Sequence, residues 1–276
     1  MKKYLFALLF GLLYLGCQQE DDLIDPGARV DGLTLYWDHE VFGKEGRRLR
    51  FEFYETKAYK NTFDLIFDYT IKGNEIVIIL KNKVDKGECP KYPGWSDLCM
   101  PKGGIYIPEK LLTEDRYTFI IKTFDFEVKS TLLTDEVKYN LDIPTHEKFT
   151  CSIKNVYPIP ANLLMGSLVF SGKENTVDAL LYIEKLEKMG LKAVTLPDFP
   201  YRQLDVGESG KPIETHWEPD NHSLPFLYKM DISFREIFEI SKEHFRKSNL
   251  NIYLFSSNGD EARLSKLDGE MVIYAK

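Results

Sequence analysis

The sequence predicts two folded domains, a β-sandwich followed by an α+β domain, on three observations. The chain has 276 residues, enough for one large domain or two of ordinary size. Hydrophobic residues make up 43% and charged residues 29%, the balance of a globular chain with a normal core. Polar and apolar residues alternate with a period of two up to Pro144, whereas a helical period enters after His146. This change of period predicts a domain boundary near residue 145.

The first domain, residues 31–145, is expected to be an antiparallel β-sandwich of seven or eight short strands. Turns such as Gly73-Asn74 separate these strands, and the 13% aromatic content suits sheet-rich structure. In size and strand number the domain resembles an immunoglobulin-like sandwich, although it lacks the Cys-Trp-Cys pattern of true immunoglobulin domains. The expected strands cover 33–37, 49–54, 63–71, 75–80, 104–107, 116–122, 124–128 and 136–144.

The second domain, residues 146–276, is expected to be an α+β domain of ferredoxin-like plan. Its elements follow the order β-α-β-β-α-β with one extra C-terminal strand. Gly190 should end the first helix, and Ser233 with Glu236 should form a capping box at the start of the second. The expected strands cover 165–172, 191–196, 226–232, 251–256 and 271–274, and the helices 174–189 and 234–245. The apolar stripe that the first helix should bury is Val177, Leu180, Leu181, Ile183, Leu186 and Met189.

The N-terminus has the layout of an export signal. Two lysines follow Met1, and an apolar run from Tyr4 to Leu15 precedes the small Gly16. This run is shorter than the ~20 apolar residues that a membrane-spanning helix needs. We therefore expect residues 1–16 to be a signal peptide rather than a membrane span or a buried helix.

The residues around Cys17 resemble the lipobox of bacterial lipoproteins. Segment 13–17 reads Leu-Tyr-Leu-Gly-Cys, with Tyr14 where most lipoboxes carry leucine. The resemblance implies that Cys17 is acylated and becomes the mature N-terminus. Segment 18–22, Gln-Gln-Glu-Asp-Asp, resembles the acidic tract of Bacteroidetes-type surface lipoproteins. That resemblance implies an anchor in the outer membrane at the cell surface, with a periplasm-facing anchor as the alternative.

The charge of the chain restricts its partners. The formal net charge is −7, and this acidic balance argues against a nucleic-acid partner, which needs a basic face. Removal of residues 1–16 takes away two lysines and no acid, so the charge of the mature chain becomes −9. Anionic membrane surfaces repel such a chain, and the N-terminal lipid must therefore hold it at the membrane. Residues 17–30 then serve as the tether.

The remaining cysteines are expected to form one disulfide and one free thiol. Cys89 and Cys99 flank a turn-rich loop, and exported proteins keep disulfides. Closing this ring should stabilise the fold by about 2.8 kcal/mol on the chain-entropy model. The two cysteines are too far apart in sequence for a usual zinc-binding pair. Cys151 remains as a free thiol, which we interpret as a buried structural cysteine.

One polar stretch is a candidate metal site. Four of its side chains would project to one side of an extended chain, and two imidazoles with two carboxylates could bind zinc or another divalent ion. Pro219 and Asn221 favour a solvated surface loop instead. The four residues are His216, Glu218, Asp220 and His222. The sequence has no phosphate-binding glycine loop, nucleophile elbow or zinc-protease motif, and it implies no cofactor.

Aromatic residues in two loops are candidates for ligand binding. Tyr92 and Trp95 lie on the cysteine loop, and Tyr201 and Trp217 lie in the later polar excursion. Aromatic side chains near proline are common in recognition surfaces, where they stack against a sugar ring or a partner chain. The alternative is that Trp95 folds back and packs against its own loop.

Two hypotheses of function follow. The first is a membrane-anchored, non-catalytic binding or envelope-assembly module whose partner is another envelope protein or a glycan. The second is a metal-dependent or hydrolytic enzyme with its site in residues 201–223. The enzyme should show a cleft lined by His216, Glu218 and His222, whereas the binding module should show an exposed aromatic patch near Trp95.

Overall fold

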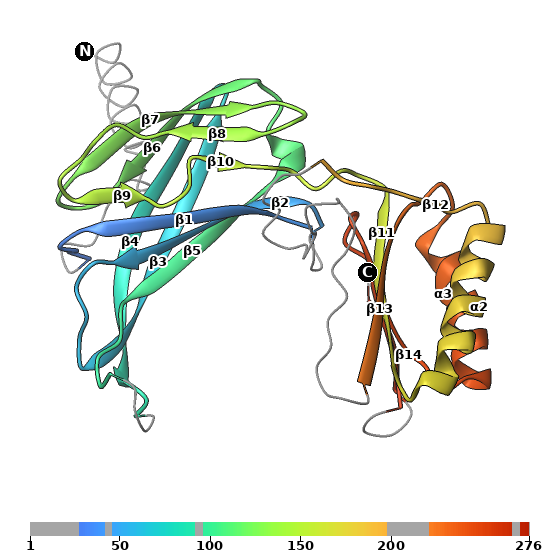
Figure 1. The fold of residues 1–276 in the computed structure, drawn as a ribbon. Helices are drawn as coiled ribbons and strands as arrows, with labels where there is room; N and C mark the ends of the chain where they lie inside the picture. Colours follow the sequence, from blue (N-terminus) through green and yellow to red (C-terminus); the bar gives the residue numbers. More distant parts are fainter. Residues whose placement is uncertain (1–27, 42–45, 92–95, 198–220, 267–270, 276) are drawn as a thin grey trace, which may run out of the picture.

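In the residues that a computed structural model describes, the protein is mostly β, with two sheets and two α-helices. The described residues are 28–41, 46–91, 96–197, 221–266 and 271–275. We call residues 28–156 the first unit and residues 163–275 the second unit. Figure 1 shows the two units side by side, with the α-helices on the second.

The first unit contains one large mixed sheet. Its strands are β1 (Leu33–Glu40), β2 (Arg48–Glu55), β3 (Asn61–Lys72), β4 (Glu75–Glu88), β5 (Lys102–Pro108), β6 (Arg116–Lys122), β7 (Glu127–Thr134), β8 (Tyr139–Asp142), β9 (Phe149–Cys151) and β10 (Asn155–Val156). Their order is β10-β8-β7-β6-β4-β3-β5-β2-β1-β9. A short 3₁₀ helix, η2 (Glu109–Leu111), follows β5. Three neighbouring pairs run parallel, namely β1 with β9, β3 with β5 and β4 with β6. The expectation of a purely antiparallel sheet is therefore wrong.

The large sheet curls until its two ends meet. Strands β9 and β10 lie only three residues apart in the chain, yet β9 pairs with β1 and β10 pairs with β8 at opposite ends of the strand order. The rings of Phe51 on β2 and Phe119 on β6 lie 5.2 Å apart, although three strands separate β2 from β6 in the sheet. This contact crosses the interior, so the curled sheet encloses one core between two layers.

The core of the first unit follows the predicted period of two. In β2 every second residue is buried, including Phe51 and Phe53. Trp37 stacks on Phe51 with ring centroids 5.7 Å apart, and its indole Nε1 donates a hydrogen bond to the Ile153 carbonyl at 2.6 Å. The polar end of the buried indole is therefore satisfied.

Several boundaries differ from those that the sequence predicts: β4 runs to Glu88, β12 covers only Lys192–Ala193, and β13 is Asn221–Lys229. The segment 124–128 begins in a turn, because the Thr123 hydroxyl accepts a hydrogen bond from the Phe126 amide at 3.0 Å. Strand β7 consequently starts only at Glu127. Strands β9 and β10 belong to the first sheet, which therefore extends to Val156, beyond residue 145.

The second unit is an antiparallel sheet covered by two helices on one face (Figure 1). Its strands are β11 (Leu163–Ser171), β12 (Lys192–Ala193), β13 (Asn221–Lys229), β14 (Asn251–Ser256), β15 (Glu261–Ser265) and β16 (Met271–Ala275). Its helices are the 3₁₀ helix η3 (Lys173–Asn175), α2 (Thr176–Lys188) and α3 (Phe234–Lys247). The strand order is β12-β13-β11-β14-β15-β16. The sequence did not indicate β15.

Helix α3 begins as the sequence predicts. The Ser233 side chain accepts a hydrogen bond from the Glu236 amide at 3.3 Å, and the Glu236 carboxylate accepts one from the Ser233 amide at 3.0 Å. This confirms the capping box, which satisfies two amides that the first turn leaves free.

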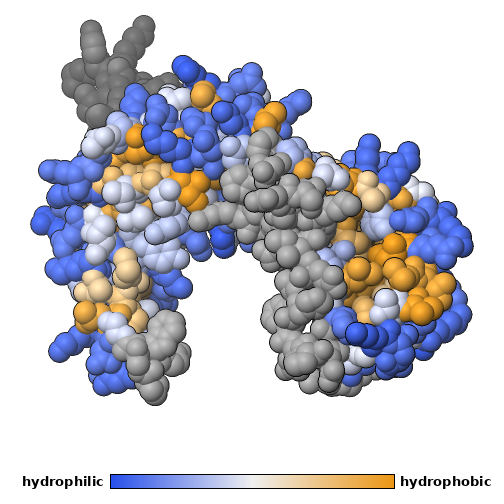
Figure 2. Space-filling view, in the orientation of Figure 1, coloured by the Kyte–Doolittle hydropathy of each residue, from blue (hydrophilic) through white to orange (hydrophobic). Residues whose placement is uncertain are grey.

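Helix α2 buries only part of the predicted apolar stripe. Val177, Leu180 and Leu181 are exposed, so the prediction that they lie in the core is wrong. The predicted Leu186 is buried, and Ile183 and Met189 pack against the same core, as predicted. The helix also turns Ala179 and Tyr182 inward. Tyr182 can be buried because its hydroxyl shares a 2.6 Å hydrogen bond with the Ser241 hydroxyl of α3. Figure 2 shows hydrophobic surface on the helical side of this unit.

Candidate functional site

Most of the residues that the sequence singled out lie outside the described residues. Among the candidate metal ligands only His222 is described, on β13, where its ring stacks on Phe170 with centroids 5.6 Å apart. Within the described ranges no three His, Cys, Asp or Glu side chains gather closely enough to hold a metal ion. The metal site and the loop aromatics therefore stay predictions. The residues outside the described ranges are Cys17, Tyr92, Trp95, Tyr201, His216, Trp217, Glu218 and Asp220.

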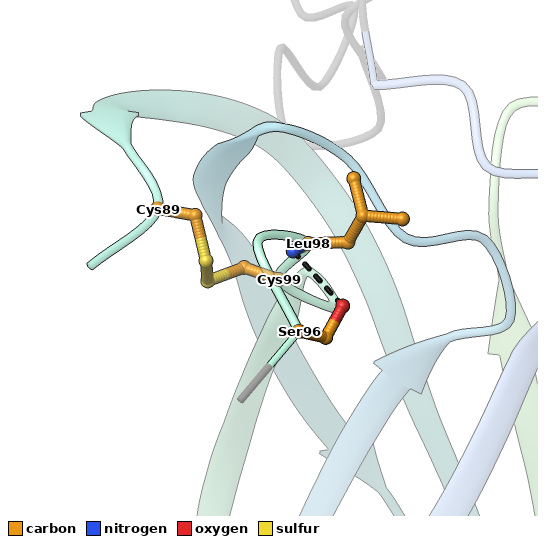
Figure 3. Close-up of a disulfide and its surroundings, with 4 residues drawn as sticks. All are labelled: Cys89, Ser96, Leu98 and Cys99. Carbon is orange, nitrogen blue, oxygen red and sulfur yellow. Dashed lines mark hydrogen bonds between the residues drawn. A yellow bond between two sulfur atoms is a disulfide. The ribbon is translucent and has the colours of Figure 1, made fainter. Parts of the chain in front are cut away.

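The predicted disulfide is confirmed. Cys89 and Cys99 are bonded, with Cα atoms 5.7 Å apart (Figure 3). The Cys99 amide donates to the Tyr59 carbonyl at 2.8 Å, and the Tyr59 amide donates to the Cys99 carbonyl at 2.9 Å. Next to the bridge, the Leu98 amide donates to the Ser96 hydroxyl at 3.1 Å. The bridge and these backbone bonds fix both ends of the loop against the segment that leads into β3.

Cys151 is the free cysteine of the described chain. Its thiol is half-buried and donates a hydrogen bond to the Ile153 carbonyl at 3.0 Å. Burial raises the pKa of the Cys151 thiol. Because the thiolate is the reactive form, this environment makes Cys151 a poor nucleophile, in keeping with the structural role that the sequence predicts.

A groove of about 300 Å³ opens on the first unit between β2, β3 and β5. We call it the β5 groove; the side chains at its mouth are Arg50, Glu52, Tyr54, Asp64, Ile66 and Tyr106. Strands β3 and β5 pair at one position, Asp64 with Lys102, and the backbones stay close at Gly103, where a Cβ would lie 1.8 Å from the Leu65 carbonyl oxygen. The floor of the groove needs glycine, because a Cβ at Gly104 would lie 2.5 Å from the Phe51 carbonyl oxygen.

An ion pair holds one guanidinium in place at the groove. Arg50 donates from Nε and Nη2 to the two carboxylate oxygens of Asp38, at 3.0 and 2.8 Å. Asp38 is buried, and its hydrogen bonds and charge hold the pKa of Arg50 above its ordinary value. Nη1 of Arg50 lies 3.7 Å from Oε1 of Glu52. The groove therefore presents a fixed donor group beside a carboxylate acceptor.

Tyrosine rings border the same surface. Tyr36 and Tyr54 meet edge to face with centroids 5.4 Å apart, and the Arg48 guanidinium lies 3.8 Å from the centroid of the Tyr106 ring. Tyr106 remains 41% exposed. Burial and the nearby Glu52 carboxylate raise the pKa of Tyr54, so its hydroxyl stays protonated and can donate. Side chains alternate along a strand, so the sequence of β2 was enough to predict that Arg50, Glu52 and Tyr54 lie on one face. Their closeness to β3 could not be foreseen.

A second, partly buried polar cluster lies where the two units meet; His39 and Tyr139 are buried, and Arg47 and Glu109 are partly exposed. The Tyr139 hydroxyl donates to Glu109 Oε1 at 2.6 Å, and Arg47 binds the same carboxylate through Nε and Nη2. Nε2 of His39 lies 3.5 Å from Glu109 Oε1, and its Nδ1 accepts a hydrogen bond from the Ile159 amide at 3.2 Å. Nδ1 is therefore unprotonated. A neutral His39 carries its proton on Nε2, facing Glu109.

This cluster connects the two units. Burial raises the pKa of Glu109, but its contacts with His39, Arg47 and Tyr139 outweigh burial and hold that pKa well below its ordinary range. Arg47 also donates to the carbonyls of Ile159 at 2.7 Å and of Ser257 in the second unit at 3.4 Å. The ionised Glu109 therefore fixes Arg47, and Arg47 fixes the junction. The adjacent apolar cluster consists of Val41, Ile159, Leu163, Met165, Leu196 and Leu227.

The comparisons with known proteins give no relative. No family model, curated protein or solved structure matches the chain. Within the described residues, no helix is both long and apolar enough to cross a membrane. The functional argument therefore rests on the residues of the β5 groove and on the signals in the sequence.

Proposed function

We propose that this protein is an exported, lipid-anchored, non-catalytic binding module of a bacterial cell envelope, and that the β5 groove binds a glycan. The anchor is an acylated Cys17 in the outer membrane, with the folded units at the cell surface. Of the two partners that the sequence left open, an envelope protein and a glycan, the groove favours the glycan.

One arrangement carries this proposal: exposed tyrosine rings beside a fixed guanidinium and a carboxylate. The C–H face of a sugar ring packs on an aromatic ring, and sugar hydroxyls both donate and accept hydrogen bonds. At the groove Tyr106 offers the ring, Arg50 offers donors and Glu52 offers acceptors. Because Asp38 already holds Arg50, ordering its side chain costs the complex little entropy.

The disulfide supports export. Cys89 and Cys99 are joined in the structure, and such bonds persist in oxidising compartments outside the cytoplasm. The basic and apolar residues before Cys17 supply the corresponding signal.

The second unit is proposed to be ferredoxin-like. Its first four strands have the order β12-β13-β11-β14, with α2 after β11 and α3 after β13, and this is the order of a split βαβ plan. Strands β15 and β16 extend the β14 side. The immunoglobulin-like assignment of the first unit rests on its size and its two-layered core, and its three parallel pairs depart from that plan.

The proposal is tested by electrophoresis of the purified protein in gels that contain soluble polysaccharides. The probes are a β-glucan, a xylan, a pectin and an alginate, each in a separate gel. We expect at least one to retard the wild type, and the same polysaccharide to retard Tyr106→Ala much less. Val137→Ala is the control, because Val137 is 56% exposed and lies outside the groove lining. If no polysaccharide retards the wild type, or if both variants behave alike, the groove is not a glycan site.

A further inference from the structure

We propose that strand β16 is a self-association surface, on which a second copy of the chain adds its own β16 in antiparallel orientation. This inference is independent of the β5 groove. Strand β16 ends the order of the second sheet, and among the strands that the structure describes it pairs with β15 alone. No other described strand covers its outer edge, whose backbone groups are therefore available to a partner strand.

The composition of β16 favours pairing. Edge strands are commonly protected by charged residues, proline or a bulge, and Met-Val-Ile-Tyr-Ala contains neither a charge nor a proline. The register with β15 runs unbroken from Met271 to Ala275, without a bulge. Ile273 is 42% exposed, and Met271 and Tyr274 are also exposed. An edge of this kind is a template for another strand.

The sequence of β16 is complementary to itself. Antiparallel pairing about a two-fold axis at Ile273 places Ile273 opposite its copy, Val272 opposite Tyr274 and Met271 opposite Ala275. Every opposed pair is apolar, which is the favourable case for directly facing residues. The axis stands perpendicular to the sheet, so the two copies of α3 lie on the same face and run antiparallel.

Charges on α3 fit this antiparallel arrangement. The Tyr274 ring lies 5.1 Å from the Phe238 ring and 5.8 Å from the Phe234 ring, so this side of α3 faces β16. Lys242 Nζ lies 5.9 Å from the Phe238 centroid on the same side, and Arg246 follows one turn later. The C-terminal half of the exposed side is therefore basic.

The N-terminal half of the same side is acidic. A cleft of about 910 Å³ opens there between α3, the β14–β15 turn and the end of β16. Its lining includes three carboxylates, from Asp231, Glu239 and Asp260, against one cation, Arg235. Two-fold pairing brings this acidic end of one copy beside the basic end of the other. In a two-fold dimer the contact between an acidic end and a basic end forms twice. This favours a second copy of the chain over an unrelated peptide strand as the partner.

The test measures the oligomeric state of the purified protein by sedimentation equilibrium over micromolar to millimolar concentrations. We expect a reversible dimer of the wild type. Ile273→Lys opposes two lysines at the axis and should raise the dimer dissociation constant by at least about tenfold. Leu180→Lys is the control, since Leu180 is 55% exposed on α2 and away from β16. It should leave the dimer unchanged.

A charge exchange tests the orientation. Arg246→Glu should weaken the dimer by about fivefold, because two acidic ends then meet, and Asp231→Arg added to it should restore the affinity. Circular dichroism of each variant checks that the fold is kept. A wild type that stays monomeric at every concentration overturns the proposal, as does equal weakening by Ile273→Lys and Leu180→Lys. Failure of the double variant to recover overturns the antiparallel arrangement.

Discussion

Removal of the Cys89–Cys99 bridge should destabilise the first unit by about 2.8 kcal/mol. The bond closes a ring with a sequence separation of 10, and the chain-entropy model assigns about this value to such a ring. In the folded state the loop ends stay held by the paired backbone bonds between Tyr59 and Cys99. The double substitution of Cys89 and Cys99 by serine should therefore leave the fold intact and act mainly on the unfolded chain.

The assay is urea unfolding followed by tryptophan fluorescence, with and without a reductant. Trp37 is buried in the core of the first unit, so its emission reports the unfolding of that unit. We expect the reduced wild type and the double serine variant to share one lowered midpoint. Cys151→Ser is the matched control and should cost much less, because a serine hydroxyl can make the same hydrogen bond to the Ile153 carbonyl. Equal midpoints for the oxidised and reduced protein would refute the reasoning.

Three further predictions concern the groove, the helix cap and the junction. Tyr106→Ala should weaken binding of a retained polysaccharide about fivefold, measured by affinity electrophoresis, since an aromatic contact contributes about 1 kcal/mol. Ser233→Ala should lower the stability of the second unit by about 1 kcal/mol in thermal unfolding, because it removes the cap of α3. Glu109→Gln should destabilise the protein at neutral pH, with a difference that shrinks in acid. The pKa of Glu109 is depressed in the folded state, so its stabilisation is present above the ordinary value of 4.5 and is lost as the carboxylate protonates. Urea midpoints across the acid range test this, and a difference independent of pH contradicts it.

Local patterns were enough for many elements. The period of two placed β2, because every second residue from Leu49 to Glu55 is buried. The Ser233–Glu236 box placed the start of α3, because both partners lie within one turn. The loop between Cys89 and Cys99 was read correctly, since its ends are close in sequence.

The buried face of α2 could not be read from hydrophobicity alone. Val177 and Leu180 are apolar but exposed, whereas Tyr182 is fully buried. Tyrosine is buried at low cost only where its hydroxyl finds a partner, and that partner, Ser241, lies on another helix 59 residues later. The period of apolar residues along one helix carries no information about a hydrogen bond to a residue so distant in sequence.

By itself the sequence determined the alternation of the strands and the local caps and turns, because each depends on neighbours along the chain. The export and anchoring signals around Cys17 stay predictions from the sequence. Only the tertiary structure decided that β9 and β10 join the two ends of one curled sheet. It also decided that β3 lies beside β5, so that residues of both strands line the β5 groove together with Arg50. Strand pairing between distant segments depends on how the whole sheet buries its apolar face, and no short window of sequence contains that information.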